Sequence, residues 1–274
     1  MNSTGNIGKG SISARFGVVA LFATAMGLLE AIVVVYLRAL YYPGGFAFPL
    51  APMAPPIYRA ELVREVATLV MLGAVAWLAG RNRLQRLGAF LFTFAVWDII
   101  YYVALKIFLN WPASLLTWDI LFLIPVTWMG PVLAPVINSL TMIAMALLWH
   151  TLDRRHPPLS LRPAEWLLTL SGALLIFFTY VRDFTLLILQ SRNPVSAGNP
   201  ATAQQITLTL SHYIPEQFLW GIFTAGELLI LTAMTLTWWR VNHKQKLITQ
   251  NKKAFITSGL PPDLRNLFET PPKQ

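Results

Sequence analysis

The chain has 274 residues, of which 55% are hydrophobic and only 12% are charged, about half the charged fraction of an ordinary soluble domain. It contains no cysteine, which excludes structural disulfides and zinc or iron–sulfur centres held by cysteine. The net charge of +9 does not indicate nucleic-acid binding, because the Lys and Arg residues lie in short patches beside apolar segments. This composition predicts a protein whose main partner is a lipid bilayer.

Six segments are apolar over enough residues to cross about 30 Å of hydrocarbon as helices. The sequence therefore predicts an all-α polytopic integral membrane protein with six transmembrane helices. We expect a cytoplasmic N-terminus at 1–15, a transmembrane domain at 16–240 and a cytoplasmic C-terminal tail at 241–274. The six spans are expected at 16–42, 60–80, 87–109, 131–150, 164–189 and 214–239.

The distribution of basic residues predicts the orientation. Of the 21 Lys and Arg residues, 15 lie before the first span, in the second and fourth connections, or after the last span. Because cytoplasmic loops carry the excess of basic residues, both termini are expected in the cytoplasm. The expected location is a bacterial inner (plasma) membrane.

Two apolar connections on the outer side are unusual. The first, residues 41–59, is rich in proline and is expected to fold back onto the membrane surface. The other contains "SLLTWDILFLIPVTWMG", residues 114–130, which we interpret as a short interfacial or re-entrant helix before span four. Thr117 would cap this helix and Asp119 would lie in its first turn with no further role. The alternative is one kinked, tilted helix that continues into span four, although prolines oppose a regular rod.

Ionisable residues within the spans lie at mid-membrane or in the outer halves. A charge at the centre of a bilayer costs at least about 2.5–3.5 kcal/mol, so this one-sided placement predicts pairing, access to water, or both. We expect five helices to close around an outward-facing polar chamber with three more acids than bases. These residues are Glu30, Arg38, Glu61, Arg64, Glu65, Asp98, Lys106, Arg182, Asp183, Glu216 and Glu227.

Helical spacing predicts which of these groups share a face. Asp98, Tyr102 and Lys106 follow one another at intervals of four residues, and Glu30 and Arg38 are separated by eight. Side chains at these intervals lie along one helix face. The pairs Glu30–Arg38 and Asp98–Lys106 either lock helices together or take part in function, and the sequence leaves both open.

Two further features concern the last spans. Arg182 and Asp183 point about 100° apart on a helix, which favours separate partners over a mutual pair. Glu216 and Glu227 are expected on one stripe of the sixth span. Glycines next to carboxylates, in "GLLEAI" and "GIFTAGE", are expected to permit close helix contact.

The resulting hypothesis is a chamber that binds or translocates a proton, a cation or a small polar solute. Two alternatives remain: an accessory subunit of a respiratory or photosynthetic membrane complex, and an intramembrane enzyme with a lipid substrate. The sequence names no catalytic residue, cofactor or metal ligand set, and leaves open contacts with other subunits or a second copy. The residues expected to bind the solute or ion are Asp98, Glu227, Glu30, Arg38, Tyr102, Lys106, Arg182, Asp183, Glu61, Arg64 and Glu65.

Overall fold

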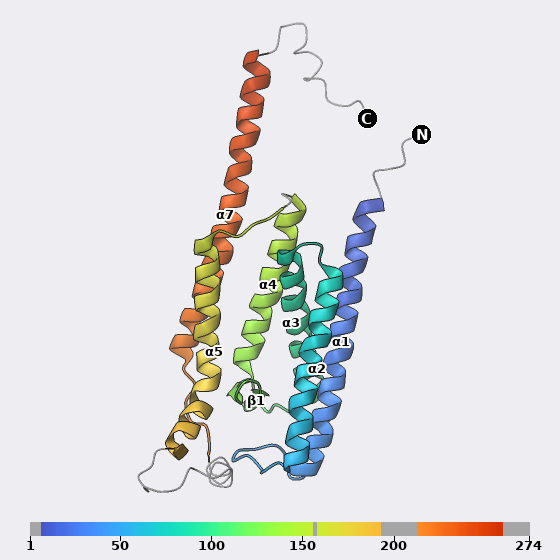
Figure 1. The fold of residues 1–274 in the computed structure, drawn as a ribbon, viewed down its shortest axis with the longest axis vertical. Helices are drawn as coiled ribbons and strands as arrows, with labels where there is room; N and C mark the ends of the chain where they lie inside the picture. The colour runs from blue at the N-terminus through green and yellow to red at the C-terminus, as the bar shows by residue number, and fades with distance from the viewer. Residues whose placement is uncertain (1–6, 156–157, 193–212, 260–274) are drawn as a thin grey trace.

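The computed structural model describes residues 7–155, 158–192 and 213–259. Six of its helices are long and apolar enough to cross a membrane, which confirms an all-α, six-span membrane protein. The long axes of these helices run roughly side by side (Figure 1). The helices are α1 (Ile7–Tyr41), α2 (Pro55–Ala79), α3 (Arg83–Leu109), α4 (Leu133–Arg155), α5 (Pro163–Arg192) and α7 (Trp220–Gly259).

The candidate spans agree with those expected from hydropathy to within about six residues at each end. The largest shift is at α7, whose span is Trp220–His243 rather than 214–239. The start of α1 and the end of α7 lie at one end of the molecule, which we call the terminal end (Figure 1). We call the opposite end, where residues 42–54 join α1 to α2, the hairpin end.

Local sequence signals explain where several helices begin and end. Proline occupies the first turn of α2, where its missing N–H costs no helical hydrogen bond. Asn82 caps α3 by accepting a hydrogen bond from the Gln85 backbone N–H at 2.8 Å. Asn110 ends α3 in the left-handed conformation, with φ 50°.

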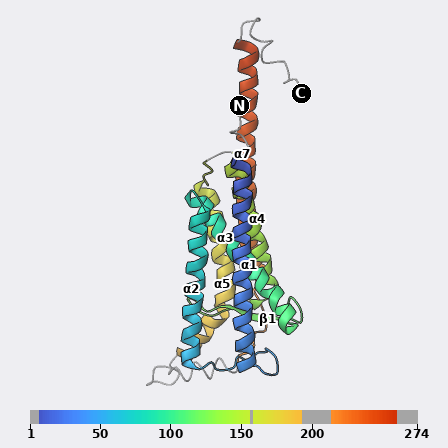
Figure 2. The same ribbon diagram turned by 90° about the vertical axis from the view of Figure 1, so that its right-hand side faces the viewer.

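The helices form two unequal groups. α3 packs against α1, α2 and α4, whereas α5 packs mainly against α7. The α5–α7 pair meets the rest of the bundle through α4 and through the short strand β2 (Trp128–Pro131). Figure 2 shows α1 and α2 side by side in the view turned by 90°.

Glycines set the closest helix contacts, as the sequence predicts. A Cβ atom at Gly27 of α1 would lie 2.7 Å from the Trp97 carbonyl oxygen of α3. Gly172 of α5 and Gly226 of α7 face each other, and a Cβ on either would lie within 2.7 Å of the other's carbonyl oxygen. The backbones of these helix pairs therefore touch where no side chain intervenes.

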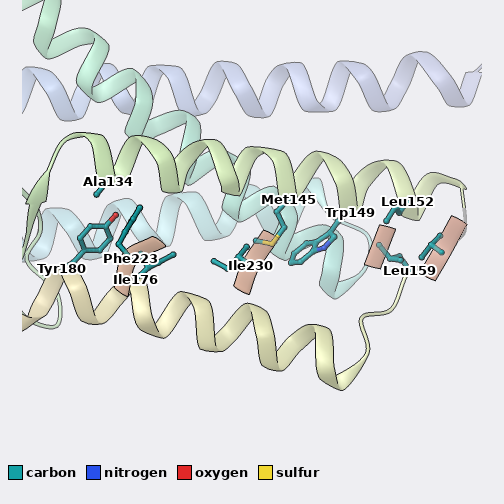
Figure 3. Close-up of a cluster of buried hydrophobic side chains, with 10 residues drawn as sticks. Ala134, Met145, Trp149, Leu152, Leu159, Ile176, Tyr180, Phe223 and Ile230 are labelled. Atoms are coloured by element: carbon teal, nitrogen blue, oxygen red, sulfur yellow. The ribbon is translucent and has the colours of Figure 1, made fainter. Parts of the chain in front are cut away.

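The largest apolar cluster joins α4, α5 and α7 (Figure 3). Met145 and Trp149 project from α4 toward α5 in the part of the cluster nearer the terminal end, and Tyr180 and Phe223 extend the cluster toward the hairpin end. Each of these four side chains is at most 5% exposed. This cluster makes α4 the element that holds the α5–α7 pair against the other helices.

The short helix expected before span four is wrong, because this segment is a β-hairpin. Strand β1 (Trp118–Phe122) pairs antiparallel with β2, with Asp119 opposite Gly130. A helix through this segment would lose a backbone hydrogen bond at Pro125, while aromatic and β-branched residues favour extended backbone. The segment turns back into the bundle: the Leu123 N–H meets Glu65, about 15 Å along α2 from its first residue.

Candidate functional site

A cavity of about 650 Å³ lies in the half of the bundle nearer the hairpin end. It is enclosed by α1, α2, α3, the hairpin, residues 42–54 and two side chains of α5. We call it the chamber. Its charged lining consists of Glu30, Arg38, Glu61, Arg64, Glu65, Asp98 and Asp119, and its aromatic lining of Tyr41, Tyr42, Phe46, Tyr58, Trp97, Tyr101, Tyr102, Phe122 and Phe184.

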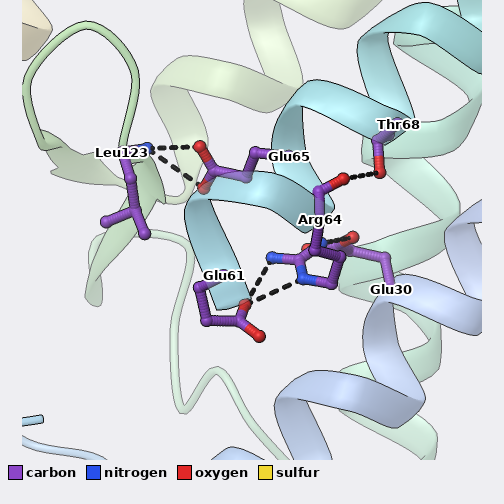
Figure 4. A network of polar contacts seen from close by, with 6 residues as sticks. All are labelled: Glu30, Glu61, Arg64, Glu65, Thr68 and Leu123. Atoms are coloured by element: carbon purple, nitrogen blue, oxygen red, sulfur yellow. Dashed lines mark hydrogen bonds and ion pairs between the residues drawn. The ribbon is translucent and has the colours of Figure 1, made fainter. Parts of the chain in front are cut away.

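Arg64 joins α2 to α1 at one wall of the chamber (Figure 4). Its guanidinium forms ion pairs with Glu61, one turn earlier on α2 at 2.7 Å, and with Glu30 of α1. Two carboxylates thus share one cation. The group carries a formal charge of −1 and fixes the distance between two helices that line the chamber.

Glu65 holds the hairpin in place. Its two carboxylate oxygens accept from the Leu123 backbone N–H at 3.0 and 3.1 Å (Figure 4). This N–H lies just beyond β1 and has no strand partner, and a backbone donor away from water needs an acceptor. In the described residues Glu65 forms no ion pair within 4.0 Å.

Arg38 and Asp119 form a second ion pair, at 3.3 Å, and both are buried. The Arg38 guanidinium lies on the face of Trp111, 3.7 Å from the ring centroid, and 4.5 Å from that of Phe46. Tyr101 donates to the second Asp119 oxygen at 3.5 Å. Burial raises the pKa of Asp119 to about 6, although Arg38 and the hydrogen bonds it accepts oppose the rise.

Asp98 lies deeper in the bundle than this pair, about three helical turns or roughly 16 Å along α3 from its last residue, Leu109. One carboxylate oxygen accepts from the Ser139 hydroxyl of α4 at 2.8 Å. Among the residues that the structure describes, Asp98 has no ion-pair partner within 4.0 Å. The lining of the chamber therefore holds five carboxyl groups and two guanidinium groups, a formal excess of three negative charges.

An apolar floor lies on the terminal side of the chamber. Met26, Leu72, Trp97 and Phe122 form a buried cluster there, each at most 8% exposed. On the hairpin side, the Tyr42 hydroxyl accepts from the Ala51 N–H at 2.9 Å, which closes residues 42–51 into a loop beside the chamber. Burial raises the pKa of the Tyr42 hydroxyl.

The structure brings together seven of the eleven residues expected at the site. Lys106 is not among them: it is exposed, and its ammonium donates to the carbonyl oxygens of Asn110 and Pro112 at 3.4 and 3.0 Å. It therefore stabilises the C-terminal end of α3 and does not pair with Asp98. The pair Glu30–Arg38 is also absent, because each residue has a partner on another element.

Arg182 and Asp183 correct the expectation of separate partners. They form a mutual ion pair at 3.0 Å, and Tyr213 donates to the second Asp183 oxygen at 2.9 Å. Flexible χ angles let adjacent side chains converge although their Cβ atoms diverge. This group lies outside the chamber lining.

The two glutamates of the sixth span also lie outside the chamber lining. Glu216 precedes α7, in a segment without helix, and is exposed, so the stripe expected to join it to Glu227 does not form. Glu227 is 6% exposed and accepts from the Thr141 hydroxyl of α4 at 2.8 Å. The chamber is consequently built from the polar faces of three helices rather than five.

Sequence reasoning missed Asp119, which is 2% exposed and central to the chamber. The signal was present: Arg38 needed an acid partner, and Asp119 stands in an apolar segment. The aromatic lining was also missed except for Tyr102, since no spacing along the chain joins residues of the first loop to those of α3.

Comparison with known protein families, with curated proteins and with solved structures finds no match for this chain. Its class therefore rests on its own features: it is a multi-pass helical membrane protein.

Proposed function

We propose that the chamber binds a cation that enters from the hairpin end. The observation that carries this proposal is the charge of the lining, five carboxyl groups against two guanidinium groups around one cavity of about 650 Å³. Carboxylates in a low-dielectric site are stabilised by a proton or by a cation. A bound cation replaces those protons, so cation binding and proton release are coupled at this site.

Glu65 and Asp98 are the proposed counter-charges of the cation. Each is held by a neutral donor, the Leu123 N–H or the Ser139 hydroxyl, which orients the carboxylate and leaves its charge uncompensated. By contrast, Asp119 already has Arg38, and Glu30 and Glu61 share Arg64. The proposed role of the paired groups is to keep the walls of the chamber apart.

The orientation proposed is the one indicated by the basic residues, with the terminal end in the cytoplasm and the chamber toward the outside. The apolar floor of Met26, Leu72, Trp97 and Phe122 supports binding from one side. Transport across the membrane would then require displacement of this floor, as in other proteins with alternating access.

The test is a thermal-unfolding screen of the purified protein in detergent micelles. The chloride salts of sodium, potassium, ammonium and organic ammonium ions are compared at constant ionic strength. We expect at least one cation to raise the unfolding temperature of the wild type, since a ligand that binds the folded state stabilises it. The variant Glu65→Gln/Asp98→Asn is expected to lose this response.

The matched control is Glu216→Gln, which removes an exposed carboxylate outside the chamber. It is expected to keep the wild-type response. If no cation stabilises the wild type, or if the response survives in the double variant, the proposed function is wrong.

A further inference from the structure

We propose that the cation is an organic ammonium compound with an apolar body and an acceptor oxygen. This inference rests on the proposed function and adds the chemical class of the ligand. Four features of the chamber carry it: its size, its aromatic walls, the way it holds the guanidinium of Arg38, and two buried donors in its lining.

The size of the chamber fits an organic ligand. Its volume of about 650 Å³ lies within the range of about 300–1,000 Å³ that is usual for sites of drug-sized molecules. A calcium or magnesium ion needs several oxygen ligands at about 2.0–2.6 Å. In the part of the chain that is described, no group of three or more His, Asp or Glu side chains is placed to hold a metal ion.

The walls of the chamber suit an alkylated ammonium group. Nine aromatic side chains contribute to the lining, among them Tyr58 and Tyr102, and face the same space as the carboxylates. An organic ammonium group is attracted to aromatic faces and is less strongly hydrated than a metal ion, so it gains from both kinds of wall. Carboxylates alone do not favour it over sodium or potassium.

The protein itself contains this mode of recognition. The Arg38 guanidinium is an organic cation that lies on the face of Trp111, close to that of Phe46, and pairs with the Asp119 carboxylate at 3.3 Å. A carboxylate and an aromatic side chain are also present deeper in the chamber, where Asp98 and Trp97 both contribute to the lining. No protein cation within ion-pair distance of Asp98 is found in the described residues.

Two donors in the lining point to an acceptor on the ligand. Arg38 and Trp97 are each more than nine-tenths buried, and both line the chamber. Within the described residues, Arg38 Nη1 and Trp97 Nε1 have no hydrogen-bond partner. Arg38 lies 11 residues, or roughly 16 Å, along α1 from Gly27, which contacts Trp97, so a single ligand oxygen meets only one of these donors. Since buried donors are almost always satisfied, we assign the oxygen to Arg38 Nη1, toward the hairpin end. The deeper carboxylates then take the ammonium end of the ligand.

Isothermal titration of the purified protein in lipid nanodiscs tests this class with four probes. Acetylcholine chloride carries the ammonium group and the oxygen, and 3,3-dimethylbutyl acetate is its uncharged isostere. Pentyltrimethylammonium chloride has a similar length without the oxygen, and potassium chloride supplies an inorganic cation. We expect acetylcholine to bind about tenfold or more tightly than its uncharged isostere, and about threefold or more tightly than the pentyl compound.

Asp98→Asn is expected to weaken acetylcholine binding about tenfold, whereas Glu216→Gln, outside the chamber, leaves it unchanged. Potassium binding without acetylcholine binding would overturn the ligand class and keep the proposed function. Equal binding of the uncharged ester would overturn the ammonium assignment, and equal binding of the pentyl compound would overturn the oxygen. If none of the cations binds, the proposed function fails as well.

Discussion

Two groups of helices pack in opposite ways: α1, α2 and α3, which we call the chamber group, and the pair of α5 and α7. In the chamber group, ion pairs join helices around a cavity, as Arg64 does between α1 and α2. In the α5–α7 pair, Gly172 and Gly226 bring two backbones into contact without a polar side chain between them. Charges therefore occur where space is kept open, and glycines where it is closed.

The close contact of α1 and α3 at Gly27 sharpens this comparison. Gly27, where α1 touches the backbone of α3, lies one turn before Glu30, which lines the chamber. The floor and the charged wall are thus neighbouring turns of one helix. The depth at which the chamber begins is therefore set on α1, by the glycine contact on one turn and the charged side chain on the next.

Removing Arg64, the cation shared by Glu30 and Glu61, should have the largest effect on stability. Arg64→Gln leaves Glu30 and Glu61 without a positive partner. Breaking a buried ion pair costs about 3–5 kcal/mol, and this part-buried group corresponds to the lower end of that range. We expect this loss in the free energy of unfolding measured in detergent micelles. Hydrogen exchange should increase in α1, α2 and the hairpin, and stay unchanged in α5 and α7.

The matched control is Arg59→Gln, which removes an exposed arginine from the same helix. It is expected to change stability by less than about 0.5 kcal/mol. The second variant, Arg64→Gln/Glu30→Gln, removes one of the unpaired charges and should recover part of the loss. An equally large increase of exchange in α5 and α7 would contradict the division of the bundle into two groups.

The spans were predictable because hydropathy is a local property. Runs of about 20 apolar residues are sufficient to identify them, and the structure places the six helices close to those runs. Positions of glycine next to carboxylates were also sufficient to predict close helix contacts at Gly27 and Gly226. Each of these signals is contained in a single segment of the chain.

The hairpin and the pairing of charges were not predictable, since they depend on residues far apart in the sequence. The fold of residues 118–131 depends on Glu65, which satisfies a backbone N–H 58 residues away. Arg38 pairs with Asp119 across 81 residues and not with Glu30 on its own helix. Helical spacing indicates which side chains share a face, but only tertiary structure selects a partner on another face.

A pH titration should affect the chamber group through Asp119. Its pKa of about 6 in the folded state exceeds the value of about 3.9 expected when unfolded, so folding favours the protonated form. The contribution to stability is complete below about pH 4 and is lost as the pH rises through about 6. At about 1.4 kcal/mol per pKa unit, the loss amounts to about 3 kcal/mol.

The measurement is the free energy of unfolding between about pH 4 and pH 7.5 for the wild type and for Asp119→Asn. The difference between the two curves isolates Asp119 from the other carboxyl groups of the chamber. Arg38, Tyr101, Tyr102 and Asp98 are the charged and titratable groups that influence it. Parallel curves would show that Asp119 does not titrate differently on folding.

The smallest expected effect is at the α5–α7 contact. Adding one methyl group, by a change of glycine to alanine, should have opposite effects at two positions of α7. In Gly226→Ala the new Cβ would lie 2.7 Å from the Gly172 carbonyl oxygen, which belongs to the backbone of α5 and cannot rotate away. Overpacking of this kind costs about 1–3 kcal/mol. Gly221→Ala places its Cβ in open space and should gain up to about 1 kcal/mol from helix propensity.

The two alanine variants therefore shift the unfolding free energy in opposite directions, which neither hydrophobicity nor helix propensity alone predicts. Hydrogen exchange should rise in α5 and α7 of the Gly226→Ala variant, while acetylcholine binding to the chamber persists. Weaker binding in this variant would mean that the α5–α7 pair takes part in shaping the chamber. In that case the contribution of Phe184 to the lining would be the structural link between the two groups.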